Sequence, residues 1–224
     1  MNPELLSLKE VLKLGAYWAG SAAVSPLVAA VKVRQRLTPK FDFYLYSTAL
    51  SMIPGTLGRQ LRGAFYSHTL RRCGRNLKVE YGSYFVSPDT SVGDYVTIGA
   101  YCVVGPCTMG NNVMLASFVS ILDGLHQHGT ADPTTPMMDQ AGAPEPVHIG
   151  SNTWIGEKAL VAASIGDNTI VGVGSVVTRP VKESVLVMGN PARVIGHRYK
   201  PLVTPTKKPT GELAVDGRPE KPAA

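Results

Sequence analysis

The sequence predicts a parallel β-helix preceded by α-helices, and three observations carry this prediction. From about Lys78 onward, an aliphatic residue followed by a small residue recurs every six positions. Before that point, apolar residues recur at helical spacing. A proline-rich stretch interrupts the six-residue repeat once. We therefore expect a helical, basic extension at 1–73, an all-β core at 74–200 with a loop at 122–146, and a disordered tail at 201–224.

The composition is that of an ordinary globular protein, because 44% of the 224 residues are hydrophobic and 17% are charged. The cysteines Cys73, Cys102 and Cys107 are too few and too irregularly spaced for a disulfide framework or a zinc ribbon. Disulfide-free chains are typical of reducing compartments. We therefore expect a cytoplasmic protein.

The net charge of +6 is concentrated in the N-terminal third of the chain. Residues 1–78 carry twelve Lys or Arg against three acidic residues, whereas residues 79–224 carry ten against thirteen. A basic surface of this kind can face anionic lipid or a phosphorylated partner, and a solvated basic helix surface is the alternative. Nucleic acid is not an expected partner, because no binding motif accompanies the charge.

The helical extension is expected to begin at residues 2–4, which supply a capping side chain, a proline and an acid. The uncharged stretch 14–31 is diluted by glycine, serine and proline, so a surface-lying or protein-packed helix is favoured over a membrane span or a signal segment. A second helical region at 44–53 stops at Pro54-Gly55 and then resumes. We expect residues 1–40 to contact the inner face of a membrane peripherally.

In a hexapeptide β-helix, each repeat supplies one short strand and one corner, with the aliphatic side chain inside the coil. Neighbouring coils bury a continuous column, so no single repeat is stable alone. The aliphatic positions are Val92, Ile98, Val104, Met109, Leu115 and Ile121 before the loop, and Ile149, Ile155, Ile165, Val171 and Val177 after it. One slip of the period occurs in each of these two ladders.

The interrupting loop contains His126 and His128, followed by Asp132-Pro133. Long irregular loops in compact domains are usually functional, and this one is expected to reach toward a neighbouring subunit and shape a pocket. Histidine is the side chain whose ordinary pKa suits proton removal near neutrality. The loop is therefore the candidate catalytic segment.

Three motifs, at 147–156, 171–179 and 189–195, carry a resemblance that covers roughly residues 74–196. The chain resembles the left-handed β-helix hexapeptide acyltransferases, which include galactoside, maltose, xenobiotic and polysaccharide O-acetyltransferases. It looks most similar to polysaccharide-modifying members with a helical N-terminal extension. The resemblance implies a homotrimer that binds acetyl-CoA between neighbouring subunits and needs no metal. It also implies direct attack on the thioester by a hydroxyl of a saccharide, or of a lipid- or nucleotide-linked saccharide.

The resemblance further implies a loop histidine as the base. His128 is assigned this role, because Gln127-His128-Gly129 ahead of Asp132-Pro133 fits the family pattern better than Leu125-His126, and His126 is the alternative. Asp132 either orients the imidazole or forms a turn. The other three histidines, His68, His148 and His197, are interpreted as surface or packing residues.

The donor contacts implied by the resemblance lie in the C-terminal repeats. Packing between subunits is the alternative role for Trp154. Glu157 departs from expectation, since an acid near an anionic donor is unfavourable, and it could face solvent or pair with Lys158 or Arg179. The implied contacts are Trp154, Glu157, Gly172, Val173, Gly174, Thr178, Arg179 and Arg193.

Two other functions stay open at this point. A zinc hydratase of the γ-carbonic anhydrase type uses the same fold and needs three histidines converging on one metal. A scaffold that kept the fold without the chemistry is the second alternative, because repeats by themselves do not specify a reaction. Stoichiometric zinc would favour the first, and failure to bind acetyl-CoA the second.

Overall fold

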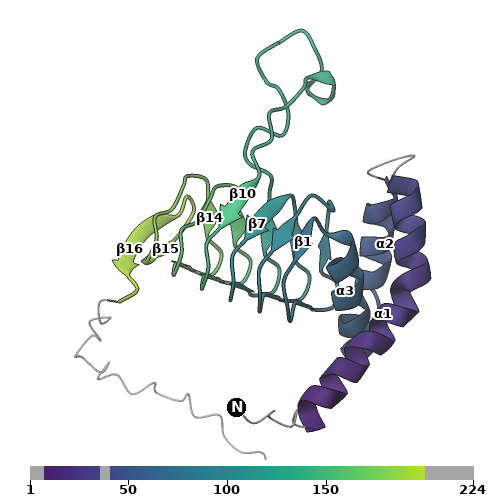
Figure 1. The fold of residues 1–224 in the computed structure, drawn as a ribbon. Coiled ribbons are helices and arrows are strands. Elements are labelled where there is room, and N and C mark those ends of the chain that lie inside the picture. Colours follow the sequence, from purple (N-terminus) through teal and green to yellow (C-terminus); the bar gives the residue numbers. More distant parts are fainter. Residues whose placement is uncertain (1–7, 36–40, 200–224) are drawn as a thin grey trace, which may run out of the picture.

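The computed structural model describes residues 8–35 and 41–199 (Figure 1). The expected helix start at residues 2–4 and the expected disordered tail at 201–224 lie outside the described residues. The described part begins with three helices, α1 (Leu8–Gln35), α2 (Phe41–Ser51) and α3 (Gly55–Thr69). The break that the sequence predicts at Pro54-Gly55 separates α2 from α3.

The strands after the helices form three sheets, and successive strands enter the three sheets in turn. Sheet A has the order β1 (Arg72–Cys73), β4 (Ser91–Val92), β7 (Cys107–Met109), β10 (Val147–Ile149). Sheet B has the order β2 (Lys78–Val79), β5 (Thr97–Ile98), β8 (Met114–Leu115), β11 (Trp154–Ile155), β13 (Ile170–Val171), β15 (Val185–Met188), β16 (Arg193–His197). Sheet C has the order β3 (Tyr84–Phe85), β6 (Val103–Val104), β9 (Ser120–Ile121), β12 (Leu160–Val161), β14 (Val176–Val177).

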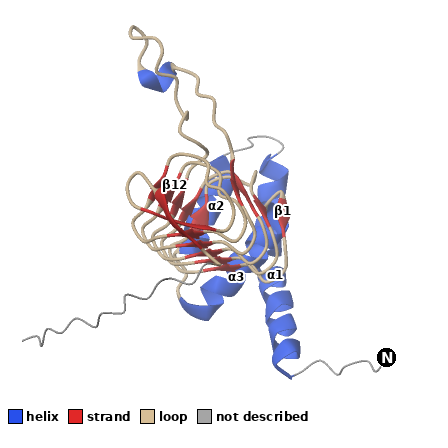
Figure 2. Cartoon of the chain, turned by 90° about the vertical axis from the view of Figure 1, so that its left-hand side faces the viewer, coloured by secondary structure: helices blue, strands red, loops and turns tan. Residues whose placement is uncertain are grey.

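Among the described strands, every pair is parallel except the last, in which β16 runs antiparallel to β15. Single bridges at Ile165 and Val181 extend sheet A beyond β10. The result is the expected left-handed β-helix, with about 6 turns and a helical region at its N-terminal end (Figures 1 and 2).

The core confirms the six-residue pattern. Every aliphatic residue assigned to the interior from the sequence is between 0 and 3% exposed. Within sheet B, Ile98, Leu115 and Ile155 stack in register, while the residue before each faces outward. Removing these side chains from water is the main stabilising term of the coil, at about 25 cal/mol per Å² of apolar surface.

The slips of the period all fall at one corner of the coil, between sheets C and A. There the spacing between successive core residues is no longer six positions, for example between Val104 in β6 and Met109 in β7. The same corner carries residues 122–146, between β9 and β10. Because this corner already accepts segments of different length, the coil tolerates a long insertion there without losing register.

The corner between sheets A and B repeats a left-handed backbone conformation in each turn. Its φ values lie between 56° and 59°, at Asn76, Tyr95, Asn112, Asn152, Asn168 and Ser184. Asparagine tolerates this conformation better than most residues, which explains why it recurs here.

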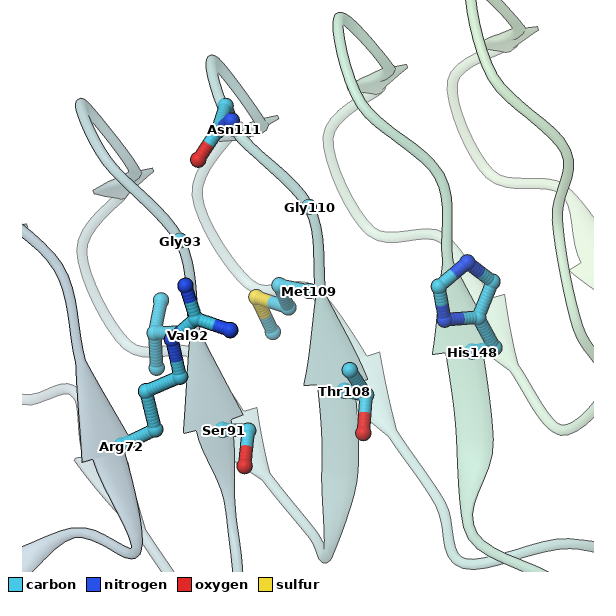
Figure 3. Close-up of a pocket in the computed structure, with 9 residues that line it drawn as sticks. All are labelled: Arg72, Ser91, Val92, Gly93, Thr108, Met109, Gly110, Asn111 and His148. Carbon is cyan, nitrogen blue, oxygen red and sulfur yellow. The ribbon is translucent and has the colours of Figure 1, made fainter.

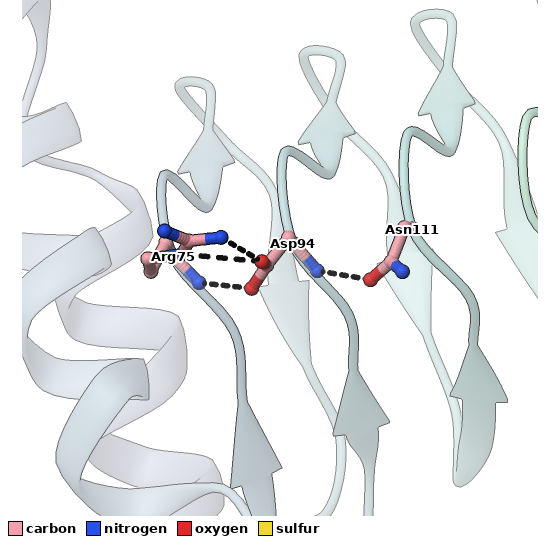
Figure 4. Close-up of polar contacts among 3 residues, drawn as sticks. All are labelled: Arg75, Asp94 and Asn111. Atoms are coloured by element: carbon pink, nitrogen blue, oxygen red, sulfur yellow. Dashed lines mark hydrogen bonds and ion pairs between the residues drawn. The ribbon is translucent and has the colours of Figure 1, made fainter.

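Polar side chains next to this corner connect successive turns (Figure 4). The Arg75 N–H donates to Asp94 Oδ1 at 2.8 Å, and the Asp94 N–H donates to Asn111 Oδ1 at 2.7 Å. The Arg75 guanidinium also pairs with Asp94 and lowers the pKa of that carboxyl. These bonds fix the register between turns at the surface as the aliphatic column does inside.

The helices close the N-terminal end of the coil. Phe85, the inward residue of β3, meets Tyr66 of α3 edge-to-face at 4.7 Å between ring centroids, and Phe43 stacks on Phe65 at 5.8 Å. All four side chains are completely buried. The helical extension is therefore continuous with the β-helix core.

Helix α1 packs on α3 rather than on the β-helix. Gly20 of α1 lies against Ala64 and the backbone of Gln60, and Val24 and Val28 are buried beside it. Trp18, on the other hand, is 64% exposed. Among the described helices, none combines the length and apolar character needed to cross a bilayer.

Candidate active site

The segment 122–146, called the arm from here on, stands out from the coil above β10 (Figure 1). Its two halves pair with each other: the Ala143 N–H donates to the His126 carbonyl at 2.8 Å, and the Glu145 N–H donates to the Asp123 carbonyl at 2.8 Å. An antiparallel bridge joins His128 to Ala141. The arm is therefore a hairpin-like element with its own hydrogen bonds.

The far part of the arm is held by Gln140 and Asp132. The Gln140 side chain donates to the carbonyls of Asp132 and Thr135, each at 2.8 Å. The Asp132 carboxylate accepts bonds from the Thr134 and Thr135 hydroxyls at 2.7 and 2.6 Å. These hydroxyls lower the pKa of Asp132 to about 2. Of its two expected roles, the contacts of Asp132 are those of a turn former.

His126 and His128 are both exposed on the arm. Within the part of the chain that the structure describes, neither imidazole has a hydrogen-bond partner. Both are therefore free to meet a substrate, and the geometry of one chain does not rank one above the other. The remaining histidines lie elsewhere: His68 in α3, His148 in β10 and His197 in β16.

The donor contacts expected from the sequence lie on several sides of the coil. Trp154 faces outward from sheet B, between Met114 and Ile170, and is 46% exposed. Glu157, Val173 and Gly174 lie at the corner between sheets B and C. Thr178 and Arg179 follow β14 at the corner from which the arm leaves, and Arg193 is on β16. All but Gly172 and Thr178 are exposed.

Gly172 and Gly174 have different reasons to be glycine. A Cβ on Gly172 would lie 2.6 Å from the Met188 side chain, so a larger residue there would require that side chain to move. Gly174 has φ +66°, with open space where a Cβ would be. Glu157 faces solvent, and no ion pair among the described residues joins it to Lys158 or Arg179.

One chain therefore does not bring all these residues to a single site. In a three-sided coil, the corner that carries the arm lies opposite sheet B, so the arm histidines and Trp154 are on different sides. The described residues also contain no cluster of three His, Cys, Asp or Glu able to hold a metal ion within one chain.

A shallow depression of about 210 Å³ lies on the outer face of sheet A (Figure 3). Ser91, Thr108 and His148 line it from three neighbouring strands, and Arg72 borders it. None of the residues assigned to the site from the sequence contributes to it. The depression is a groove between side chains on a sheet face.

The comparisons with known proteins agree with the repeat pattern. Residues 89–123 match the family model described as bacterial transferase hexapeptide (six repeats), and residues 146–179 match the hexapeptide repeat of succinyl-transferase. The two matched segments are therefore hexapeptide repeats of the kind found in bacterial transferases. The resemblance to hexapeptide acyltransferases is thereby confirmed.

Two sequence relatives of this hexapeptide-repeat chain come from Escherichia coli strain K12. One, provisionally named a lipopolysaccharide biosynthesis O-acetyl transferase (WbbJ), is 32% identical over 123 residues, which cover 51% of this chain and 60% of the relative. The other, galactoside O-acetyltransferase, is 30% identical over 125 residues, which cover 54% of each protein. The matches thus span little more than half the length of these relatives.

The crystal structure of a maltose O-acetyltransferase from Clostridium difficile 630 shares the fold. Its TM-score is 0.64 at 26% sequence identity, over 74% of this chain and 90% of that one. The similarity therefore extends over most of the known enzyme.

The sequence interpretation missed one feature of the hexapeptide-repeat surface, an aromatic column at the corner between sheets B and C. Tyr101 and Phe118 lie there in successive turns, each about half exposed. The signal was present, because each follows an inward aliphatic residue by three positions, where the turns after the arm have Lys158 and Gly174.

Proposed function

We propose that this chain is an acetyl-CoA-dependent O-acetyltransferase that acetylates a hydroxyl of a saccharide or polysaccharide precursor. One observation carries the proposal: an arm with two exposed histidines interrupts a β-helix whose repeats match proteins named O-acetyltransferases. The names of the relatives refer to lipopolysaccharide, a galactoside and maltose, which supports a saccharide as the class of acceptor.

In the proposed reaction, an imidazole of the arm, assigned to His128 with His126 as the alternative, accepts the proton of the acceptor hydroxyl. The hydroxyl oxygen forms a bond to the thioester carbonyl carbon, and the carbon–sulfur bond then breaks. Coenzyme A leaves as a thiolate and takes the proton from the imidazolium. The products are an O-acetyl saccharide and free coenzyme A, without an acyl-enzyme.

A second copy of the chain is part of this proposal, because the arm and Trp154 lie on different sides of one coil. The arm is long enough to extend beyond its own coil, and Met137 and Met138 at its far part are 67% and 82% exposed. We propose a homotrimer in which the arm of one subunit faces the donor residues of the next. Holding donor and acceptor together between subunits would supply much of the rate enhancement.

Replacing His128 by alanine tests the base. A base of this kind contributes about 10²–10⁴ in rate, so we expect kcat to fall by that factor with an unchanged KM for acetyl-CoA. His126→Ala is expected to have a smaller effect, and His148→Ala, an exposed histidine on sheet A, is the matched control. Coenzyme A release with maltose and methyl β-galactopyranoside measures the rate. Undiminished turnover in both arm variants would contradict a histidine base.

The basic N-terminal third supports a place at the cytoplasmic face of a membrane. The charge of residues 1–78 suits anionic lipid, and the exposed Trp18 is a side chain that enters lipid interfaces readily. A lipid-linked saccharide would then be presented to the enzyme at the membrane surface.

A further inference from the structure

The corner between sheets B and C contains two large side chains in a backbone conformation that disfavours them. Tyr101 has φ 56° and Phe118 has φ 60°. The equivalent positions of other turns hold Gly82, Lys158 and Gly174, also with positive φ. The left-handed conformation therefore recurs along this corner, and for a bulky residue it costs energy.

Burial in the core does not explain the two rings. Tyr101 is 47% exposed and Phe118 is 49% exposed, so each keeps about half of its surface in solvent. The aliphatic column at this level of the coil is complete without them, because Val104 and Leu115 already fill the interior. The rings are therefore a surface feature.

The rings are nevertheless held in fixed positions. They stack on each other with 5.1 Å between centroids and 10° between planes, and Tyr81 meets Tyr101 edge-to-face at 5.5 Å. A Cβ on Gly82 would lie 2.5 Å from the Tyr101 ring, so the absence of a side chain there makes room for it. An ordered aromatic surface loses little conformational entropy when a ligand packs against it.

The aromatic column lies in line with the residues assigned to the donor. Along this corner, the Lys158 N–H donates to the Ser117 carbonyl, and the Gly174 N–H donates to the Glu157 carbonyl. The turn after Phe118 thus carries Glu157, and the next turn carries Val173 and Gly174. A molecule packed on the aromatic rings would lie beside the donor positions, on the N-terminal side.

We propose that Tyr101 and Phe118 form the acceptor platform, against which a pyranose ring of the saccharide packs. This inference rests on the proposed function. The C–H face of a pyranose is apolar and matches the surface of an aromatic ring. Its hydroxyls stay accessible to an arm histidine of the neighbouring subunit in the proposed trimer. The rings carry no charge, which suits a neutral sugar better than a phosphate or a carboxylate.

Replacing each aromatic residue by asparagine tests the platform, and these substitutions are expected to leave the fold intact. Asparagine occurs at the equivalent left-handed positions of the neighbouring corner, so Tyr101→Asn and Phe118→Asn are compatible with the backbone. Each variant is expected to raise the KM for maltose and methyl β-galactopyranoside about tenfold, the scale of one aromatic contact. The KM for acetyl-CoA and its affinity by calorimetry are expected to stay unchanged.

Tyr95→Asn is the matched control. Tyr95 has φ 58° and is 51% exposed, but it lies at the corner between sheets A and B, with the Arg75 guanidinium 6.0 Å from its ring centroid. Its replacement is expected to leave both KM values unchanged. Saturation-transfer NMR with maltose gives a second readout, in which the Tyr101 and Phe118 variants lose the signal and the Tyr95 variant keeps it.

The outcomes separate the two proposals. No transfer to any saccharide and no acetyl-CoA binding by the unaltered protein would contradict the proposed function. Transfer with an unchanged acceptor KM in both aromatic variants, or no NMR signal from maltose in the unaltered protein, would overturn the platform alone. A change of sedimentation from trimer to monomer in the Asn variants would also overturn it, because the column would then be a contact between subunits.

Discussion

Arg62 is a charged side chain at the centre of the join between helices and β-helix. It is completely buried. Its Nε donates to the Val79 carbonyl at 2.9 Å, and its Nη1 donates to the carbonyls of Leu50 and Ile53 at 3.0 and 2.8 Å. The first two carbonyls belong to β2 and to the end of α2. One guanidinium thus satisfies backbone groups of two elements from its place on α3.

We expect Arg62→Ala to lower the free energy of unfolding by about 3 kcal/mol, because it removes charge-assisted hydrogen bonds to several buried carbonyls. Urea denaturation of the full chain measures the change. Arg59→Ala is the control, since Arg59 makes a part-exposed ion pair with Glu80 at 3.1 Å and should change stability by less than about 1 kcal/mol. Equal effects of the two substitutions would contradict the role given to Arg62.

At the scale of the elements, the backbone conformation and the hydrogen bonds of the corners hold each turn of the coil in place on the next. Asn168 lies at the corner between sheets A and B with φ 56° and accepts a bond from the Asn152 side chain at 2.8 Å. Its backbone conformation and its hydrogen bond contribute separately to the stability of the protein. Glycine would keep the first and lose the second, whereas alanine would lose both.

Asn168→Ala is expected to destabilise the protein by about 1 kcal/mol, because alanine lacks the polar side chain that lets asparagine tolerate the left-handed conformation and also loses the bond from Asn152. Asn168→Gly should cost clearly less, although it removes the same hydrogen bond. Thermal unfolding of the two variants beside the unaltered protein distinguishes them. If alanine and glycine were equivalent, the side-chain bond and not the backbone would govern this corner.

The molecule as a whole is polarised, with a basic helical end and a coil that carries a net negative charge. We expect the full chain to co-sediment with vesicles containing phosphatidylserine and to remain in solution with phosphatidylcholine alone. Raised salt should weaken the binding, because the attraction is electrostatic. A folded variant lacking residues 1–40 should no longer co-sediment. Unchanged partitioning of that variant would contradict a membrane contact through this region.

Much of the fold could be predicted from the sequence, because the pattern that specifies a hexapeptide coil is local. A side chain six positions after an inward one is inward again, so Ile98 and Ile155 could be placed inside without a structure. The position of the arm followed in the same way, as an interruption between Ile121 and Ile149. The two histidines and the turn at Asp132 belonged to that interruption.

The sequence by itself therefore determined the coil, its interior and the segment that carries the histidines. The tertiary structure decided which residues meet across turns. Successive turns differ in length. Lys78 pairs with Thr97 in the next turn and Trp154 pairs with Ile170, and the two pairs are separated by different numbers of residues. The lengths of the successive turns together decide that Tyr101 stacks on Phe118 and that Trp154 lies on the side of the coil opposite the arm. Contacts between turns depend on the number of residues in each turn, and the six-residue repeat does not specify that number.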